Sequence, residues 1–226
     1  MRLLALDTSG ASQSVALLED ERCLHESFDP QPVSHSETLL RSVDAALQTV
    51  SWRLGDLDLF AVSAGPGSFT GLRIGMSTLK GLSLATGKPA VGVSALQALA
   101  LPRLVPELWV VPCLDARCGE VYAGAYRGSP EDIKIGLEDR AWPIEVFLQH
   151  LAELPGDKLV LGNALVAYRE RFSGLAQTGE EQESVRASSV GRLALRAFRA
   201  GGAGILQPRY LRASEAENRL ARKPGP

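Results

Sequence analysis

The chain has 226 residues, of which 45% are hydrophobic and 22% charged, the composition of a globular protein with one large or two small domains. No apolar run approaches the roughly 20 residues that span a bilayer, and Asp7 ends the apolar start too early for a signal peptide. We therefore expect a cytoplasmic protein without membrane association. Cys23, Cys113 and Cys118 form no Cys-x-x-Cys pair, which favours small packed side chains over a redox or metal site.

The formal net charge of −2 conceals an uneven distribution. Residues 1–60 hold ten acidic and four basic side chains, whereas residues 186–226 hold nine basic and two acidic ones. A basic C-terminal region either contacts RNA phosphates or an acidic partner, or forms a solvated helix face. The sequence leaves both alternatives open.

The first half of the chain begins with three apolar runs joined by tight turns, which predicts an antiparallel meander. Ser34-His35-Ser36-Glu37 fits a capping box and predicts the start of a helix. The three strands of the meander are expected at 2–7, 13–19 and 22–28. After the first helix we expect a strand at 57–64, a helix at 68–85, a strand at 90–93 and a helix that Ser94 caps.

The second half repeats this order in miniature. We expect strands at 108–115, 120–127, 133–137 and 158–162, helices at 143–154, 164–172 and 189–201, the last capped by Ser189, and a loop over 173–187. Two similar halves predict a duplicated α/β fold of mixed sheets flanked by helices. They divide the chain into residues 1–104 and residues 105–226, with the cleft between the halves as the default ligand site.

The glycine-rich stretch from Gly65 to Gly71 lies where a strand passes into a helix. Its glycines permit close backbone approach, and the helix N-terminus offers free N–H groups to an anion. The spacing fits neither a dinucleotide fingerprint nor a P-loop, so a structural turn and a phosphate site are equally compatible with it. Asp7, at the end of the first strand, is compatible with a hydrated metal ion or with a cap of its turn.

Gly71 and Gly75 lie four residues apart on one helix, where each glycine costs about 1 kcal/mol relative to alanine. They indicate close packing against another helix, either within this domain or in a partner chain.

Catalytic patterns are sparse. The three histidines form no His-x-x-x-His pair, and Gly92-Val93-Ser94-Ala95-Leu96 lacks the last glycine of a nucleophile elbow. His35 beside Glu37 is better explained by helix capping than by acid–base chemistry. We expect no catalytic and no metal-binding residue.

The motifs together resemble the TsaB family, also called YeaZ. They are Leu4-Ala5-Leu6-Asp7-Thr8-Ser9, His35-Ser36-Glu37-Thr38-Leu39-Leu40, Gly65-Pro66-Gly67-Ser68-Phe69-Thr70-Gly71-Leu72-Arg73-Ile74-Gly75, Lys80-Gly81-Leu82, Gly92-Val93-Ser94, Asp115-Ala116-Arg117, Glu120-Val121-Tyr122 and Pro208-Arg209-Tyr210-Leu211-Arg212. The match is dense in the first 95 residues and loose over 128–205.

The resemblance implies an actin and sugar-kinase-like fold with two duplicated subdomains. It also implies a role in forming threonylcarbamoyladenosine at position 37 of tRNAs that read codons beginning with A. The expected partners are a TsaD-like catalytic subunit and a TsaE-like ATPase, with a TsaC-like enzyme supplying the intermediate. We expect no cofactor for the isolated chain, ATP or ADP in the complex, and a homodimer when the partner is absent.

TsaD-like chains carry a His-x-x-x-His pair where this chain has Ala95 and Leu99, neither of which can bind a metal. The chain is therefore expected to act as a non-catalytic subunit that pairs through its first two helices. The expected interface residues are Leu39, Leu40, Val43, Leu47, Phe69, Thr70, Gly71, Arg73, Ile74, Gly75 and Ser77. Gly75→Trp is expected to abolish pairing and leave the fold intact.

A vestigial nucleotide or phosphate site is the second expectation. Its candidate residues are Asp7, Thr8, Ser9, Gly65 and Gly67. The alternative functions are a metallopeptidase of the glycoprotease type and a small-molecule kinase, which needs a phosphate-gripping hairpin in both halves. A simple RNA-binding module is disfavoured by the few aromatic residues.

Overall fold

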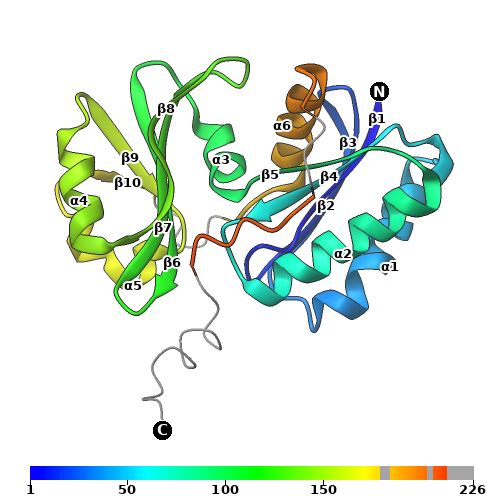
Figure 1. Cartoon of the computed structure of the whole chain (residues 1–226), viewed down its shortest axis with the longest axis horizontal. Helices are drawn as coiled ribbons and strands as arrows, with labels where there is room; N and C mark the ends of the chain where they lie inside the picture. Colours follow the sequence, from blue (N-terminus) through cyan, green and yellow to red (C-terminus); the bar gives the residue numbers. More distant parts are fainter. Residues whose placement is uncertain (179–183, 203–205, 213–226) are drawn as a thin grey trace, which may run out of the picture.

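A computed structural model describes residues 1–178, 184–202 and 206–212 of the chain. It consists of two halves that lie side by side, each built on a five-stranded mixed sheet with helices against it (Figure 1). The expected α/β architecture is confirmed. None of the helices in this described part has the length and hydrophobicity of a membrane-spanning segment.

The first sheet has the strand order β3-β2-β1-β4-β5. Its strands are β1 (Arg2–Asp7), β2 (Gln13–Glu19), β3 (Arg22–Asp29), β4 (Leu59–Gly65) and β5 (Ala90–Ser94). The central strand β1 pairs antiparallel with β2 and parallel with β4. Residues 3–7 of β1 and all of β4 are buried, because helices cover both faces of the sheet.

Two helices, α1 (His35–Thr49) and α2 (Phe69–Thr86), cover one face of this sheet (Figure 1). Their inward side chains, such as Leu39, Val43 and Met76, pack on alternate residues of β1 and β4. The opposite face is covered by α6 (Ala187–Arg199), a strongly amphipathic helix, with α3 (Ala95–Ala100) beside it. Short 3-10 turns at Leu54–Asp56 and Leu101–Arg103 complete this half.

The second sheet has the order β10-β9-β6-β7-β8. In the opposite direction this order is β8-β7-β6-β9-β10, which matches β3-β2-β1-β4-β5 of the first sheet strand for strand. Its strands are β6 (Leu108–Arg117), β7 (Glu120–Gly128), β8 (Ile133–Pro143), β9 (Asp157–Leu161) and β10 (Ala176–Gln177). Helices α4 (Ile144–Glu153) and α5 (Ala164–Tyr168), with a 3-10 turn at Arg169–Phe172, pack on one face. The repeat of order and direction shows the duplication that the sequence predicts.

The two helices between the sheets join the halves. Although α6 follows the second sheet along the chain, it packs on β1, β2, β4 and β5. Helix α3 follows the first sheet and contacts β6 and β7. One hydrophobic core therefore includes residues of both halves, such as Leu3, Val110 and Leu193. The division into residues 1–104 and 105–226 stays a prediction, with α6 lying on the sheet of the other segment.

Of the three serines that were predicted to cap helices, one does so in the structure and two do not. Ser94 caps α3, since its hydroxyl accepts from the N–H of Gln97 at 3.1 Å. The capping box at Ser34 was a wrong prediction, because this hydroxyl lies 2.9 Å from the Ser36 hydroxyl and caps no N–H. Ser189 was also wrong as a cap: α6 begins at Ala187, and Glu26 accepts from the Ser188 N–H at 2.9 Å.

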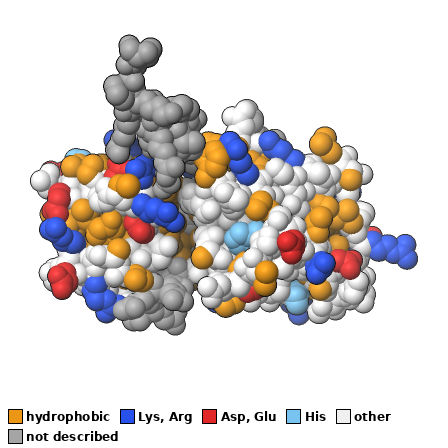
Figure 2. Space-filling model, turned by 90° about the horizontal axis from the view of Figure 1, so that it is seen from below, with side chains coloured by type: hydrophobic (Ala, Val, Ile, Leu, Met, Phe, Trp, Pro, Cys, Tyr) orange, Lys and Arg blue, Asp and Glu red, His pale blue; other side chains and the backbone are white. Residues whose placement is uncertain are grey.

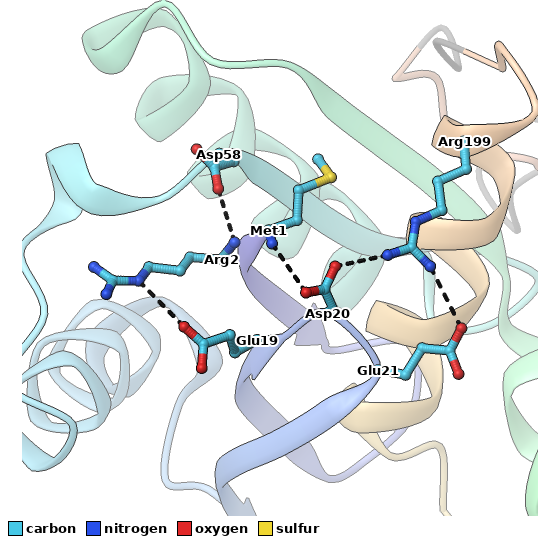
Figure 3. Close-up of polar contacts among 7 residues, drawn as sticks. All are labelled: Met1, Arg2, Glu19, Asp20, Glu21, Asp58 and Arg199. Atoms are coloured by element: carbon cyan, nitrogen blue, oxygen red, sulfur yellow. Dashed lines mark hydrogen bonds and ion pairs between the residues drawn. The ribbon is translucent and has the colours of Figure 1, made fainter.

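Basic side chains of α6 contact the chain itself, and Figure 3 shows the contacts of Arg199. Arg199 pairs with Asp20 at 2.6 Å and Glu21 at 3.5 Å in the β2–β3 turn, and the amino terminus of Met1 also pairs with Asp20. Arg196 donates to the carbonyl oxygen of Pro130 at 2.7 Å. Within the described residues, these arginines of α6 pair with the chain itself; residues 213–226 of the basic region lie outside the described part.

Candidate functional site

The turn after β1 lies directly on the start of α2. Thr8 Oγ1 donates to the carbonyl oxygen of Gly71 at 2.7 Å, and the Ser68 N–H donates to the carbonyl oxygen of Ser9 at 2.7 Å. A Cβ atom on Gly71 would lie 2.0 Å from the Thr8 carbonyl oxygen, and one on Gly75 would lie 2.4 Å from Thr8 Oγ1. The β1–β2 turn lies so close to α2 that a side chain larger than that of glycine does not fit at positions 71 and 75.

This contact decides between the two alternatives for Gly71 and Gly75. Both are buried against Thr8 of the same chain, so packing is within the domain. The expectation that Gly75→Trp leaves the fold intact is wrong, because an indole ring has no space beside Thr8. Gly67 has the same role, since a Cβ atom there would lie 2.2 Å from the Ser9 carbonyl oxygen.

Asp7 is buried at the end of β1. Its Oδ1 atom accepts from the Ser9 hydroxyl at 2.7 Å, and its Oδ2 atom and the Ser63 hydroxyl have no hydrogen-bond partner within the described residues. Burial raises the pKa of Asp7 from 3.8 to about 6, against the lowering effect of the neighbouring Ser63 hydroxyl and of the Ser9 hydrogen bonds. The Asp7 carboxyl therefore caps its own turn through Ser9.

A cleft of about 730 Å³ separates the two halves on the side of these turns. Figure 2 views the molecule from below, with the halves on either side. The cleft is lined by the β1–β2 turn, the start of α2, the β6–β7 hairpin and the C-terminal segment. Of the candidate nucleotide residues, Ser9 and Gly67 line it, whereas Asp7, Thr8 and Gly65 lie behind them.

Residues 209–212 of the C-terminal segment also line the cleft, a position that no sequence pattern predicts. Arg209, Tyr210 and Arg212 lie beside the cleft with Tyr122 and Asn163. In the sequence, these residues stand out only because they match a family motif. The described segment 206–212 is too short for a hydrophobic periodicity that would predict where it packs. The cleft that was predicted between the two halves is present in the structure. The part of its lining that comes from the C-terminal segment could not be predicted from the sequence.

The predicted partner surface is only partly accessible. Leu39, Val43 and Leu47 are buried in the core under α1, as Gly71 and Gly75 are under α2, so these five cannot contact another chain in this fold. We revise the predicted surface accordingly. The accessible or half-accessible members are Leu40, Phe69, Thr70, Arg73, Ile74 and Ser77.

Ala95 and Leu99, the positions at which the resemblance predicts the histidine pair of TsaD-like chains, are both core positions. Ala95 is 0% and Leu99 5% exposed, and both pack in the cluster between the sheets. Among the described residues, no three His, Cys, Asp or Glu side chains are grouped so that they could hold a metal ion.

Comparison with known proteins places this geometry in a family. Residues 31–217 match the family model described as TsaD, tRNA N6-adenosine threonylcarbamoyltransferase. The tRNA threonylcarbamoyladenosine biosynthesis protein TsaB of Escherichia coli is 32% identical over 99% of this chain and 100% of that protein. The chain belongs to the TsaB family. The TsaB protein of Bacillus subtilis is 29% identical over 96% of each chain.

A solved structure agrees with this assignment. YeaZ from Pseudomonas aeruginosa superimposes with a TM-score of 0.79 at 30% identity, over 93% of this chain and 99% of that one. The expected fold of two duplicated halves is therefore confirmed for this TsaB-family chain, which shares the fold of YeaZ. The likeness to actin and sugar kinases stays a prediction.

Proposed function

We propose that this chain is a non-catalytic subunit for threonylcarbamoyl transfer to adenosine 37 of tRNAs that read codons beginning with A. It acts by pairing with a TsaD-like catalytic subunit in the cytoplasm, and it forms a homodimer when that subunit is absent. A TsaE-like ATPase joins the complex, and a TsaC-like enzyme supplies the activated threonylcarbamoyl group. The match to the TsaD model supports this pairing, because related folds offer each other similar helices.

The observation that carries the proposal is the outer face of α2. Exposed residues recur there at helical spacing and form what we call the α2 face: Thr70, Arg73, Ser77, Lys80, Gly81 and Leu84. Leu84 is 84% exposed, and Leu40 on neighbouring α1 is 55% exposed. In the described part of the chain, these apolar side chains are therefore largely open to solvent.

Gly81 strengthens this argument. It lies inside α2, where glycine costs about 1 kcal/mol relative to alanine. Unlike Gly71 and Gly75, it faces open space, because no atom of the described residues lies within 4 Å of a Cβ atom built on it. No contact among the described residues requires a glycine at position 81. We propose that a glycine stands there because a partner helix approaches α2 closely near Ser77 and Gly81.

The kinase alternative is weakened by the second hairpin. The β1–β2 turn spans residues 8–12, whereas the β6–β7 turn has only Cys118 and Gly119 between the paired residues Arg117 and Glu120. A two-residue turn gives little backbone with which to surround a phosphate. We therefore assign ATP or ADP to the complex rather than to the isolated chain.

The test is reconstitution of threonylcarbamoyl transfer to tRNA from the TsaC-like, TsaD-like and TsaE-like proteins of the same organism. We expect modification only when this chain is added, and loss of that stimulation with Gly81→Leu. Val166→Asp, at an exposed apolar position of α5, is the control that should retain it. Full activity without this chain, or transfer by this chain alone, would overturn the proposal.

A further inference from the structure

The C-terminal segment 206–212, here called the strap, crosses between the two halves (Figure 1). It is fixed to the first half at two points. The Arg209 N–H donates to the carbonyl oxygen of Ala64 at 2.7 Å, which adds a backbone hydrogen bond at the end of β4. The Tyr210 ring stacks on Phe69 with 4.7 Å between centroids, and its hydroxyl accepts from Nε of Arg73 at 3.1 Å.

The same seven residues are fixed to the second half by charged side chains. Arg212 pairs with Glu120 at 3.0 Å and donates to the carbonyl oxygen of Ala116 in the β6–β7 hairpin. Arg209 pairs with Asp139 on β8 at 3.7 Å. Asp139 is itself buried and accepts from the hydroxyls of Ser94 and Tyr126. The Arg212 contacts are the more shielded, since its side chain is 22% exposed and that of Arg209 is 50% exposed.

The strap contacts the α2 face through Tyr210. Arg73 belongs to that face. Its guanidinium carbon lies 3.8 Å from the Phe69 centroid, and its Nε donates to the Tyr210 hydroxyl. A fixed arginine loses less conformational entropy when a partner binds than a free one does. The order of Arg73 in turn depends on Tyr210, and the position of Tyr210 depends on Arg212 two residues later.

We propose that the strap completes the partner surface and couples it to the second half, so that Arg212 and Glu120 set how tightly the partner subunit binds although neither lies on α2. This inference rests on the proposed function, since it takes the α2 face as the surface for a related subunit. Tyr210, 41% exposed, is an added contact residue, and Arg212 is a positioning residue.

The test is a double-mutant cycle of Arg212→Ala and Tyr210→Ala in the full chain, with the dissociation constant for the TsaD-like subunit as the readout. Each variant should weaken binding by roughly three- to tenfold. The double variant should bind no more weakly than Tyr210→Ala alone, because Arg212 acts through Tyr210. Arg199→Ala removes an arginine that is equally ion-paired but distant from the strap, and it should leave the affinity unchanged.

A second readout needs no partner. Hydrogen exchange of residues 206–212 should accelerate in Arg212→Ala and stay at the wild-type rate in Arg199→Ala. Additive losses of affinity, or wild-type binding and exchange in Arg212→Ala, would overturn the coupling. If the wild-type chain binds no TsaD-like subunit, the proposed function fails. Accelerated exchange in Arg212→Ala would then still support the inference that Arg212 holds the strap in place, and unchanged exchange would refute that inference.

Discussion

Single residues at the β1–β2 turn combine a buried charge with close backbone contacts. Asp7 has no access to solvent, and a pKa of about 6 means that the folded chain holds its proton more tightly than the unfolded chain does. Stability linked to this group is therefore lost as the pH rises from 3.8 to about 6, and the ionised carboxyl destabilises the fold above that range.

Asp7→Asn should remove this penalty. We expect the variant to be more stable than the wild type near neutral pH by up to about 3 kcal/mol, at about 1.4 kcal/mol for each pH unit of the raised pKa. The advantage should shrink toward zero below pH 4, where the wild-type carboxyl is protonated in both states. Urea unfolding at acidic and neutral pH measures this, and a difference that does not depend on pH would contradict the argument.

Two glycines of α2 should respond oppositely to the same substitution. Gly71→Ala places a methyl group against the Thr8 carbonyl and should destabilise the fold by roughly 1–3 kcal/mol. Gly81→Ala faces open space and should stabilise the isolated chain by up to about 1 kcal/mol. Urea midpoints compare the two variants directly. Equal effects would mean that the Thr8 contact is not what requires glycine at position 71.

At the scale of elements, apolar periodicity was sufficient for most strands and helices. The predicted bounds of β1 and β2 agree with the structure, because buried runs between turns are determined locally. The prediction failed where a distant residue decides the boundary. Strand β8 extends to Pro143 because it pairs with β7 along its length, beyond the apolar run that ended the prediction at Leu137.

The start of α6 is the clearest case of a boundary set from a distance. Glu26 on β3 accepts from the N–H and the hydroxyl of Ser188 at 2.9 and 3.0 Å, and the Ser14 hydroxyl accepts from the Ala187 N–H. A carboxylate at this end of a helix also interacts favourably with the helix dipole. No local sequence pattern indicates a cap that comes from 162 residues earlier.

Glu26→Ala should therefore destabilise the whole fold by about 1–2 kcal/mol, as expected for loss of a helix N-cap. Glu26→Gln, which keeps the shape and loses the charge, should cost less. Thermal unfolding followed by circular dichroism measures both. His25→Ala, on the same strand but with no part in the cap, is the control, and a loss as large as that of Glu26→Ala would contradict the assignment.

At the scale of the whole molecule, the duplicated sheets were predictable and the assembly of the site was not. The repeat of strand order is visible in the sequence because each half has its own apolar pattern. The cleft, by contrast, brings together Ser9, Arg117 and Tyr210, whose proximity follows from the packing of α3 and α6 between the sheets. The same packing buries Leu39 and Val43, which a helical pattern alone cannot distinguish from partner contacts.

The exposed α2 face is the feature from which the proposed function follows. The chain buries the inner residues of α2 against its own sheet and leaves Gly81 and Leu84 exposed on the outer side of the helix. A related subunit that packs its own helices there would bury Leu84 and use the space beside Gly81.

The most direct measurement is size-exclusion chromatography with light scattering on this chain, alone and mixed with the TsaD-like protein of the same organism. We predict a stoichiometric heterocomplex with the wild type and with Val166→Asp, and separate elution with Gly81→Leu, whose circular dichroism should remain that of the wild type. A heterocomplex that forms equally well with Gly81→Leu, or a wild-type chain that ignores the TsaD-like protein with and without nucleotide, would contradict the assignment of the α2 face as the partner surface.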